Sequence, residues 1–84
     1  MKLRKKEYGT CNIVGKNIEE LRKKKGISQR DFIEKIQLSG YDMNPSSYSK
    51  LEGQLKVATD KELFAIAKVL NVPIDKLFIK NEKN

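Results

Sequence analysis

The amino-acid sequence predicts a small all-α protein, a compact bundle of five short helices. Apolar residues recur at the three- and four-residue spacing of amphipathic helices in several separate stretches. Ser28, Asn44 and Thr59 each precede such a stretch, at the position where a side-chain oxygen can cap a helix. The chain has 84 residues, enough for one domain with one modest core.

The composition favours an acidic partner. The net charge is +7, and residues 1–56 carry 13 Lys and Arg against 7 Asp and Glu, a net of +6. A basic surface of this kind is typical of nucleic-acid binding. Cys11 is the single cysteine and there is no His, so we expect no disulfide framework, no metal site and no cofactor. We also expect no membrane span and no signal peptide, which favours a cytoplasmic protein in a reducing compartment.

The two ends of the chain have little apolar surface to bury. Residues 1–12 are expected to form a flexible basic arm, and residues 80–84 a frayed tail. The arm either contacts the sugar-phosphate backbone or a minor groove, or is simply a solvated tail. Its candidate contact residues are Lys2, Arg4, Lys5 and Lys6.

Two helices are expected before residue 39. The first runs from about Ile13 to Gly26, and the basic residues of its last turn complement the helix dipole. The second begins after Ser28 as N-cap, with Asp31 as an acidic capping partner. Gln29 lies in its first turn, where an amide, free backbone N–H groups and the dipole can meet a phosphate. Residues 38–43 are expected to form the following loop.

The sequence contains residues that favour both the start and the end of a third helix. Asn44 is an N-cap, Pro45 suits the first helical position, and Gly53 is expected to leave the helix through a left-handed turn. Its inward face is apolar and its outward face is small, hydroxylated and basic, which either allows close approach to a groove or marks a polar surface helix. The outward residues are Ser46, Ser49 and Lys50.

The fourth and fifth helices supply most of the C-terminal core. Thr59 and Glu62 form a capping box for the fourth helix, Asn71 ends it, and Pro73 opens the fifth. The predicted core residues of the whole chain are Val14, Ile18, Leu21, Phe32, Ile36, Tyr48, Leu51, Leu63, Ile66, Leu70 and Leu77.

Three strings of this sequence resemble the Xre family, the phage-repressor type of helix-turn-helix domain. They are Gly26-Ile27-Ser28-Gln29, Tyr48-Ser49-Lys50-Leu51-Glu52-Gly53 and Leu63 to Leu77. The resemblance covers residues 13–79 and implies a repressor-like fold in which helices 2 and 3 form the helix-turn-helix. Three positions depart from the family pattern. Ile33 stands where the family prefers Ala, and the loop of residues 38–43 is longer than the common turn. The family's Glu-x-Gly ending is replaced by Glu52-Gly53-Gln54.

The resemblance implies sequence-specific binding to double-stranded DNA, with the third helix in the major groove. The base contacts would be Pro45, Ser46, Ser49 and Lys50. The phosphate contacts would be Gln29, Ser28, Asn44, Ser47 and Lys56. Glu52 matches a family Glu that has a basic structural partner, for which Arg22 and Arg30 are both candidates.

These features predict a small prokaryotic or phage-type transcriptional regulator, a repressor, without catalytic activity or a small-molecule effector domain. The alternative is a protein-interaction module of the same fold, such as an antitoxin or an anti-repressor. The operator would be palindromic if the chain is a homodimer. The candidate dimer surface comprises Val69, Val72, Ile74 and Phe78.

Overall fold

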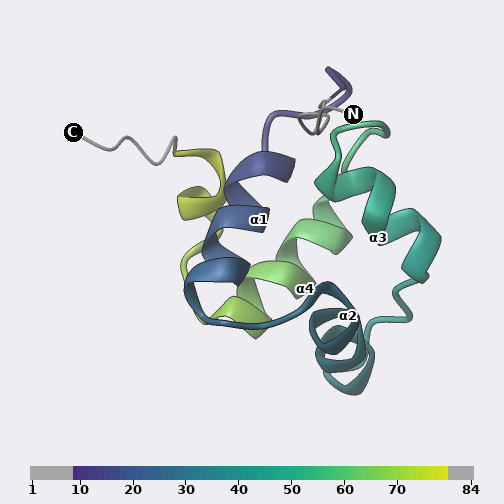
Figure 1. Ribbon diagram of the computed structural model, residues 1–84, viewed down its shortest axis with the longest axis vertical. Helices are drawn as coiled ribbons and strands as arrows, with labels where there is room; N and C mark the ends of the chain where they lie inside the picture. Colours follow the sequence, from purple (N-terminus) through teal and green to yellow (C-terminus); the bar gives the residue numbers. More distant parts are fainter. Residues whose placement is uncertain (1–8, 80–84) are drawn as a thin grey trace, which may run out of the picture.

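The computed structural model describes residues 9–79, and this part of the chain is all-α (Figure 1). Its elements are α1 (Gly15–Lys24), α2 (Gln29–Leu38), α3 (Pro45–Glu52), α4 (Asp60–Leu70) and the 3-10 helix η1 (Ile74–Phe78). α4 packs against α2 and η1, and α3 packs against α1 and α2. None of the helices in the described ranges is long and apolar enough to cross a membrane.

The sequence predicts five helices, but residues 9–79 contain four α-helices, because the fifth element is a short 3-10 helix. Pro73 has an extended backbone and Ile79 is extended again, so only five residues are left between them. A segment this short favours the tighter i to i+3 hydrogen bond. It still buries Leu77 completely, as the sequence predicts.

All three predicted N-caps are confirmed. Ser28 Oγ accepts a hydrogen bond from the backbone N–H of Asp31 at 3.1 Å, and Asn44 Oδ1 accepts one from Ser47 at 3.0 Å. Thr59 and Glu62 form both bonds of the capping box, at 3.2 and 3.0 Å. These local bonds set where α2, α3 and α4 begin.

Three helix boundaries differ from the predicted ones. α1 begins at Gly15 rather than near Ile13, because Asn12 Oδ1 accepts hydrogen bonds from the backbone N–H groups of Val14 and Gly15. α2 includes Leu38, so the loop starts one residue later. Gly53 is not left-handed, with φ at −81°, and Gln54 takes the positive φ of 61° instead.

The left-handed backbone at Gln54 is held by its side chain. Gln54 Nε2 donates to the carbonyl of Asn12 at 2.7 Å, and Gln54 Oε1 accepts from the backbone N–H of Lys16 at 3.2 Å. These two bonds join the loop after α3 to the start of α1. They offset the strain that a non-glycine residue has at positive φ.

The N-terminal segment is attached at the same place. The backbone N–H of Gly9 donates to Gly53 and that of Cys11 to Gln54, at 2.8 and 3.0 Å. Gly9 has no room for a side chain, since a Cβ would meet the carbonyl of Gln54. Residues 9–12, assigned above to the arm, are therefore bonded to the domain. The arm residues Lys2, Arg4, Lys5 and Lys6, and the tail 80–84, lie outside the described residues.

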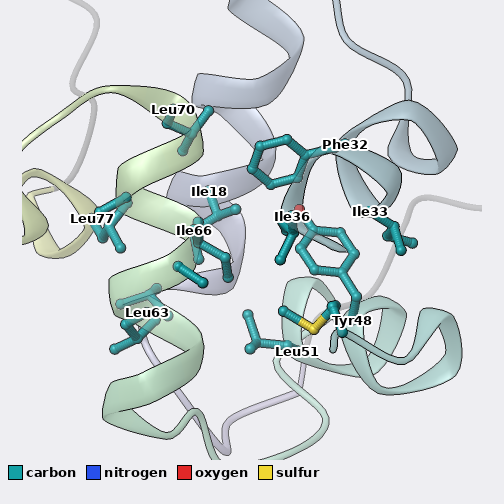
Figure 2. Packing of buried hydrophobic residues seen from close by; sticks show 14 residues of the cluster. Ile18, Phe32, Ile33, Ile36, Tyr48, Leu51, Leu63, Ile66, Leu70 and Leu77 are labelled. Atoms are coloured by element: carbon teal, nitrogen blue, oxygen red, sulfur yellow. The ribbon is translucent and has the colours of Figure 1, made fainter. Parts of the chain in front are cut away.

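The predicted core is confirmed except at Leu21, which is only partly buried (Figure 2). Ile33, Met43, Ala65 and Ala67 are also buried. The rings of Phe32 and Tyr48 meet edge to face, with centroids 5.6 Å apart and planes at 66°. This contact joins α2 to α3 through the centre of the core.

Candidate nucleic-acid interface

α3 has one buried and one exposed face. Tyr48, Leu51 and Glu52 are fully buried, whereas Ser46, Ser49 and Lys50 are exposed. The predicted division of the helix into two faces is thus confirmed. The exposed face consists of short hydroxyl side chains and one cation, so that the backbone of α3 is accessible to a large partner.

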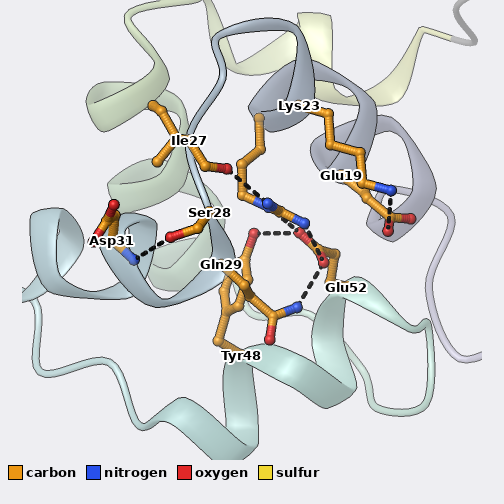
Figure 3. A network of polar contacts seen from close by, with 9 residues as sticks. Glu19, Lys23, Ile27, Ser28, Gln29, Asp31, Tyr48 and Glu52 are labelled. Atoms are coloured by element: carbon orange, nitrogen blue, oxygen red, sulfur yellow. Dashed lines mark hydrogen bonds and ion pairs between the residues drawn. The ribbon is translucent and has the colours of Figure 1, made fainter.

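The buried end of α3 carries a carboxylate that joins three helices (Figure 3). Glu52 accepts hydrogen bonds from Arg22 Nε at 2.8 Å and Arg22 Nη2 at 3.2 Å. It also accepts from Gln29 Nε2 at 2.8 Å and from the Tyr48 hydroxyl at 2.7 Å. Arg22 comes from α1 and Gln29 from α2, so this single side chain fixes α3 relative to both. Of the two candidate partners of Glu52, the structure selects Arg22.

The charges in this network are matched. A hydrogen bond from Arg22 to Glu52 raises the pKa of the guanidinium above its ordinary value. Burial, and then the charge of Glu52, raise the pKa of the Tyr48 hydroxyl. Arg22 Nη1 also donates to the carbonyl of Ile27 at 2.7 Å, at the turn into α2. Arg22 therefore stays a cation and Tyr48 a donor, and charged hydrogen bonds attach the C-terminal end of α3 to α1 and α2.

The longer connection between α2 and α3 is also anchored. Gln37 Nε2 donates to the carbonyl of Met43 at 2.7 Å, and the Met43 side chain is buried. Gly40 takes a φ of 113°, a backbone conformation that favours glycine. The loop of residues 39–44 is thus bonded to the last turn of α2, and it places Asn44 at the N-cap position of α3.

Five of the predicted contact residues surround one surface hollow of about 380 Å³. They are Asn44, Ser46, Ser47, Lys50 and Lys56. The side chain of Lys56 also forms an ion pair within the protein, since its Nζ lies 2.9 and 2.8 Å from the two carboxylate oxygens of Glu62. Lys50 is thus the cation of this hollow whose side chain is exposed.

A second hollow of about 350 Å³ lies between α2 and the start of α3. Gln29 and Pro45, both predicted contacts, line it together with Arg30. Arg30 is exposed and was not among the predicted DNA contacts, although an Arg in the first turn of α2 next to Gln29 is a signal that the sequence contains. Ser28 serves as the cap of α2, and Ser49 is exposed outside both hollows.

The surface built from these residues suits an anionic, extended partner. First-turn residues of α2 and α3 line these hollows, and the start of each helix has backbone N–H groups and a positive dipole end. Within residues 9–79, no cluster of His, Cys, Asp or Glu is arranged to hold a metal ion.

The comparison with protein families agrees with this geometry. The family described as helix-turn-helix matches residues 18–77, from α1 to the end of the buried part of η1. No curated protein and no solved structure gives a significant match to the chain.

Proposed function

Because the chain belongs to the Xre-type family of helix-turn-helix DNA-binding regulators, we propose that it binds a specific double-stranded operator and acts as a transcriptional repressor. The observation that carries this proposal is the exposed face of α3. Ser46, Ser49 and Lys50 lie on a helix whose opposite face is fixed by the Glu52 network. A helix that is attached to its neighbours in this way and has small outward side chains fits a major groove.

In this proposal the residues divide into two roles. Pro45, Ser46, Ser49 and Lys50 approach base edges, with Lys50 donating to O6 or N7 of guanine. Ser28, Gln29, Asn44, Ser47 and Lys56 contact phosphates, and we add Arg30 to this group because it lines the hollow between α2 and α3. The protein has no catalytic role. The outward face of α3 has neither the acidic nor the apolar groups that would favour a protein partner in place of DNA.

The test compares Lys50→Ala with Gln29→Ala on a library of binding sites. Lys50→Ala should cost about 1–3 kcal/mol on the best site and relax the preference at one base pair. Gln29→Ala should weaken binding to all sequences alike, because a phosphate contact carries no sequence information. Lys35→Ala is the matched control, since this exposed lysine of α2 loses the same charge away from α3.

Gln29→Ala also removes a hydrogen bond to Glu52, so its melting temperature must be compared with that of the parent. Arg30→Ala, which leaves that network intact, should give the same uniform loss. If Lys50→Ala lowers affinity equally for every site, Lys50 does not read bases. If no variant changes binding, α3 is not in the groove and the protein-partner alternative replaces the proposal.

A further inference from the structure

Lys56, one of the proposed phosphate contacts, is held by the protein at both its backbone and its ammonium group. It lies in the loop between α3 and α4 and lines the same hollow as Lys50. The two lysines differ in freedom, because the Lys50 side chain is exposed whereas that of Lys56 is only 26% exposed.

The ammonium group of Lys56 is bonded to Glu62 of α4. Its Nζ lies 2.9 Å from Oε1 and 2.8 Å from Oε2 of that carboxylate, and Glu62 is only 5% exposed. The carboxylate is itself fixed, because Oε1 accepts a hydrogen bond from the backbone N–H of Thr59 at 3.0 Å in the capping box of α4. The start of α4 therefore determines where this ammonium group lies.

Asn12 fixes the backbone of the same lysine. Its Nδ2 donates to the carbonyl of Lys56 at 2.9 Å and to that of Leu51 at 3.0 Å. Its Oδ1 accepts from the backbone N–H groups of Val14 and Gly15, at 3.1 and 2.9 Å. The amide thus uses both of its donors and both of its acceptor positions. These bonds attach the loop that carries Lys56 to the start of α1.

The ion pair with Glu62 leaves Lys56 able to bind an anion as well. An ammonium group has three N–H donors, and the two carboxylate oxygens use two of them. Lys56 lines the hollow at α3 and the buried Glu62 does not. The carboxylate therefore holds the ammonium group from within the protein, and the third donor is left for a phosphate in the hollow.

We propose that Glu62 is a positioning residue for DNA binding, which holds the Lys56 ammonium group where a phosphate of the operator binds. This inference rests on the proposed function, because it concerns how one phosphate contact of that function is organised. Ordering a long side chain at an interface weakens binding, and Lys56 is already ordered before DNA arrives. Lys56 then fixes the DNA backbone relative to α3, whose outward residues meet the bases.

The first experiment measures the binding of Glu62→Gln to a duplex selected from a random library with the parent protein. Glutamine can still form the capping box with Thr59, but it lacks the charge that holds Lys56. We expect binding to weaken by roughly threefold to tenfold, and to the same extent on an unrelated duplex. The sign of the effect is decisive, because the variant makes the net charge of +7 more positive, and a general charge effect would strengthen binding.

Asp60→Asn is the matched control. Asp60 is the exposed first residue of α4, so this variant makes the same change in net charge and leaves the pair of Lys56 and Glu62 in place. It should bind DNA at least as tightly as the parent. A loss equal to that of Glu62→Gln would assign the effect to the start of α4 in general and overturn the proposal.

The second experiment separates positioning from a loss of stability. Lys56→Met removes the ammonium group and keeps most of the apolar stem. In that background Glu62→Gln should no longer weaken binding, because no ammonium group is left to hold. A merely structural role of Glu62 would weaken binding in both backgrounds. Affinities are compared at a temperature where thermal melts show the parent and each variant to be folded.

The outcomes distinguish this inference from the proposed function. If Glu62→Gln binds as tightly as the parent or more tightly, or loses affinity equally with and without Lys56, Glu62 does not position Lys56 for DNA. The proposed function stands in that case, because the parent still binds its selected site. A parent that binds no duplex would overturn both.

Discussion

A single buried carboxylate decides how α3 is held. Glu52 accepts four hydrogen bonds from three side chains, so Glu52→Ala would leave the Arg22 cation buried and uncompensated. Breaking a buried pair in this way costs about 3–5 kcal/mol of unfolding free energy. Urea denaturation would measure the loss, with Glu34→Ala as control because that glutamate of α2 is exposed. Equal midpoints for the two variants would show that the Glu52 network does not stabilise the fold.

A second buried carboxylate makes the fold sensitive to acid. Burial alone would raise the pKa of Glu62, but hydrogen bonds from Lys56 and Thr59 outweigh it and hold this pKa below its ordinary value. The stabilisation is therefore complete above the pKa of the unfolded chain and is lost as the pH falls through the lower pKa of the folded chain. Glu62→Gln should be less stable than the parent at neutral pH, and denaturation curves at decreasing pH should converge. A constant gap between the two proteins would contradict this assignment.

For the helices, boundaries that depend on hydrogen bonds between nearby residues can be predicted from the sequence, and boundaries that depend on distant contacts cannot. The starts of α2, α3 and α4 were predictable because Ser28, Asn44 and Thr59 bond within three residues. The start of α1 depends on Asn12, whose amide also reaches the carbonyls of Leu51 and Lys56, 39 and 44 residues away. No local pattern reveals such contacts.

In the candidate site, too, local features could be predicted from the sequence and long-range contacts could not. The helical period placed Ser46 and Lys50 together on the outward face of α3, and the structure confirms that both are exposed. The choice of Arg22 over Arg30 as the partner of Glu52 depended on how α1, α2 and α3 pack. For that reason the sequence leaves both candidates open, and only the folded chain shows that Arg30 and Pro45 line the same hollow.

α4 gives a stability prediction for a whole element. Leu70 is fully buried at its last turn, so Leu70→Ala should cost about 2–5 kcal/mol through lost burial and the cavity left behind. This is a large part of the stability available to so small a domain. Lys61→Ala, at an exposed position of the same helix, should melt like the parent. A Leu70→Ala variant that also melts like the parent would contradict the packing of α4 described above.

The charge of the whole molecule governs how its DNA binding should respond to salt. The net charge is +7, and the α3 surface offers Lys50, Arg30 and two helix N-termini rather than an apolar pocket. With about 4–6 phosphates neutralised per domain, log K should fall against log salt with a slope of roughly −4 to −6, doubling when two copies bind. Fluorescence anisotropy on a selected site would give this slope. A slope near zero would exclude DNA as the partner.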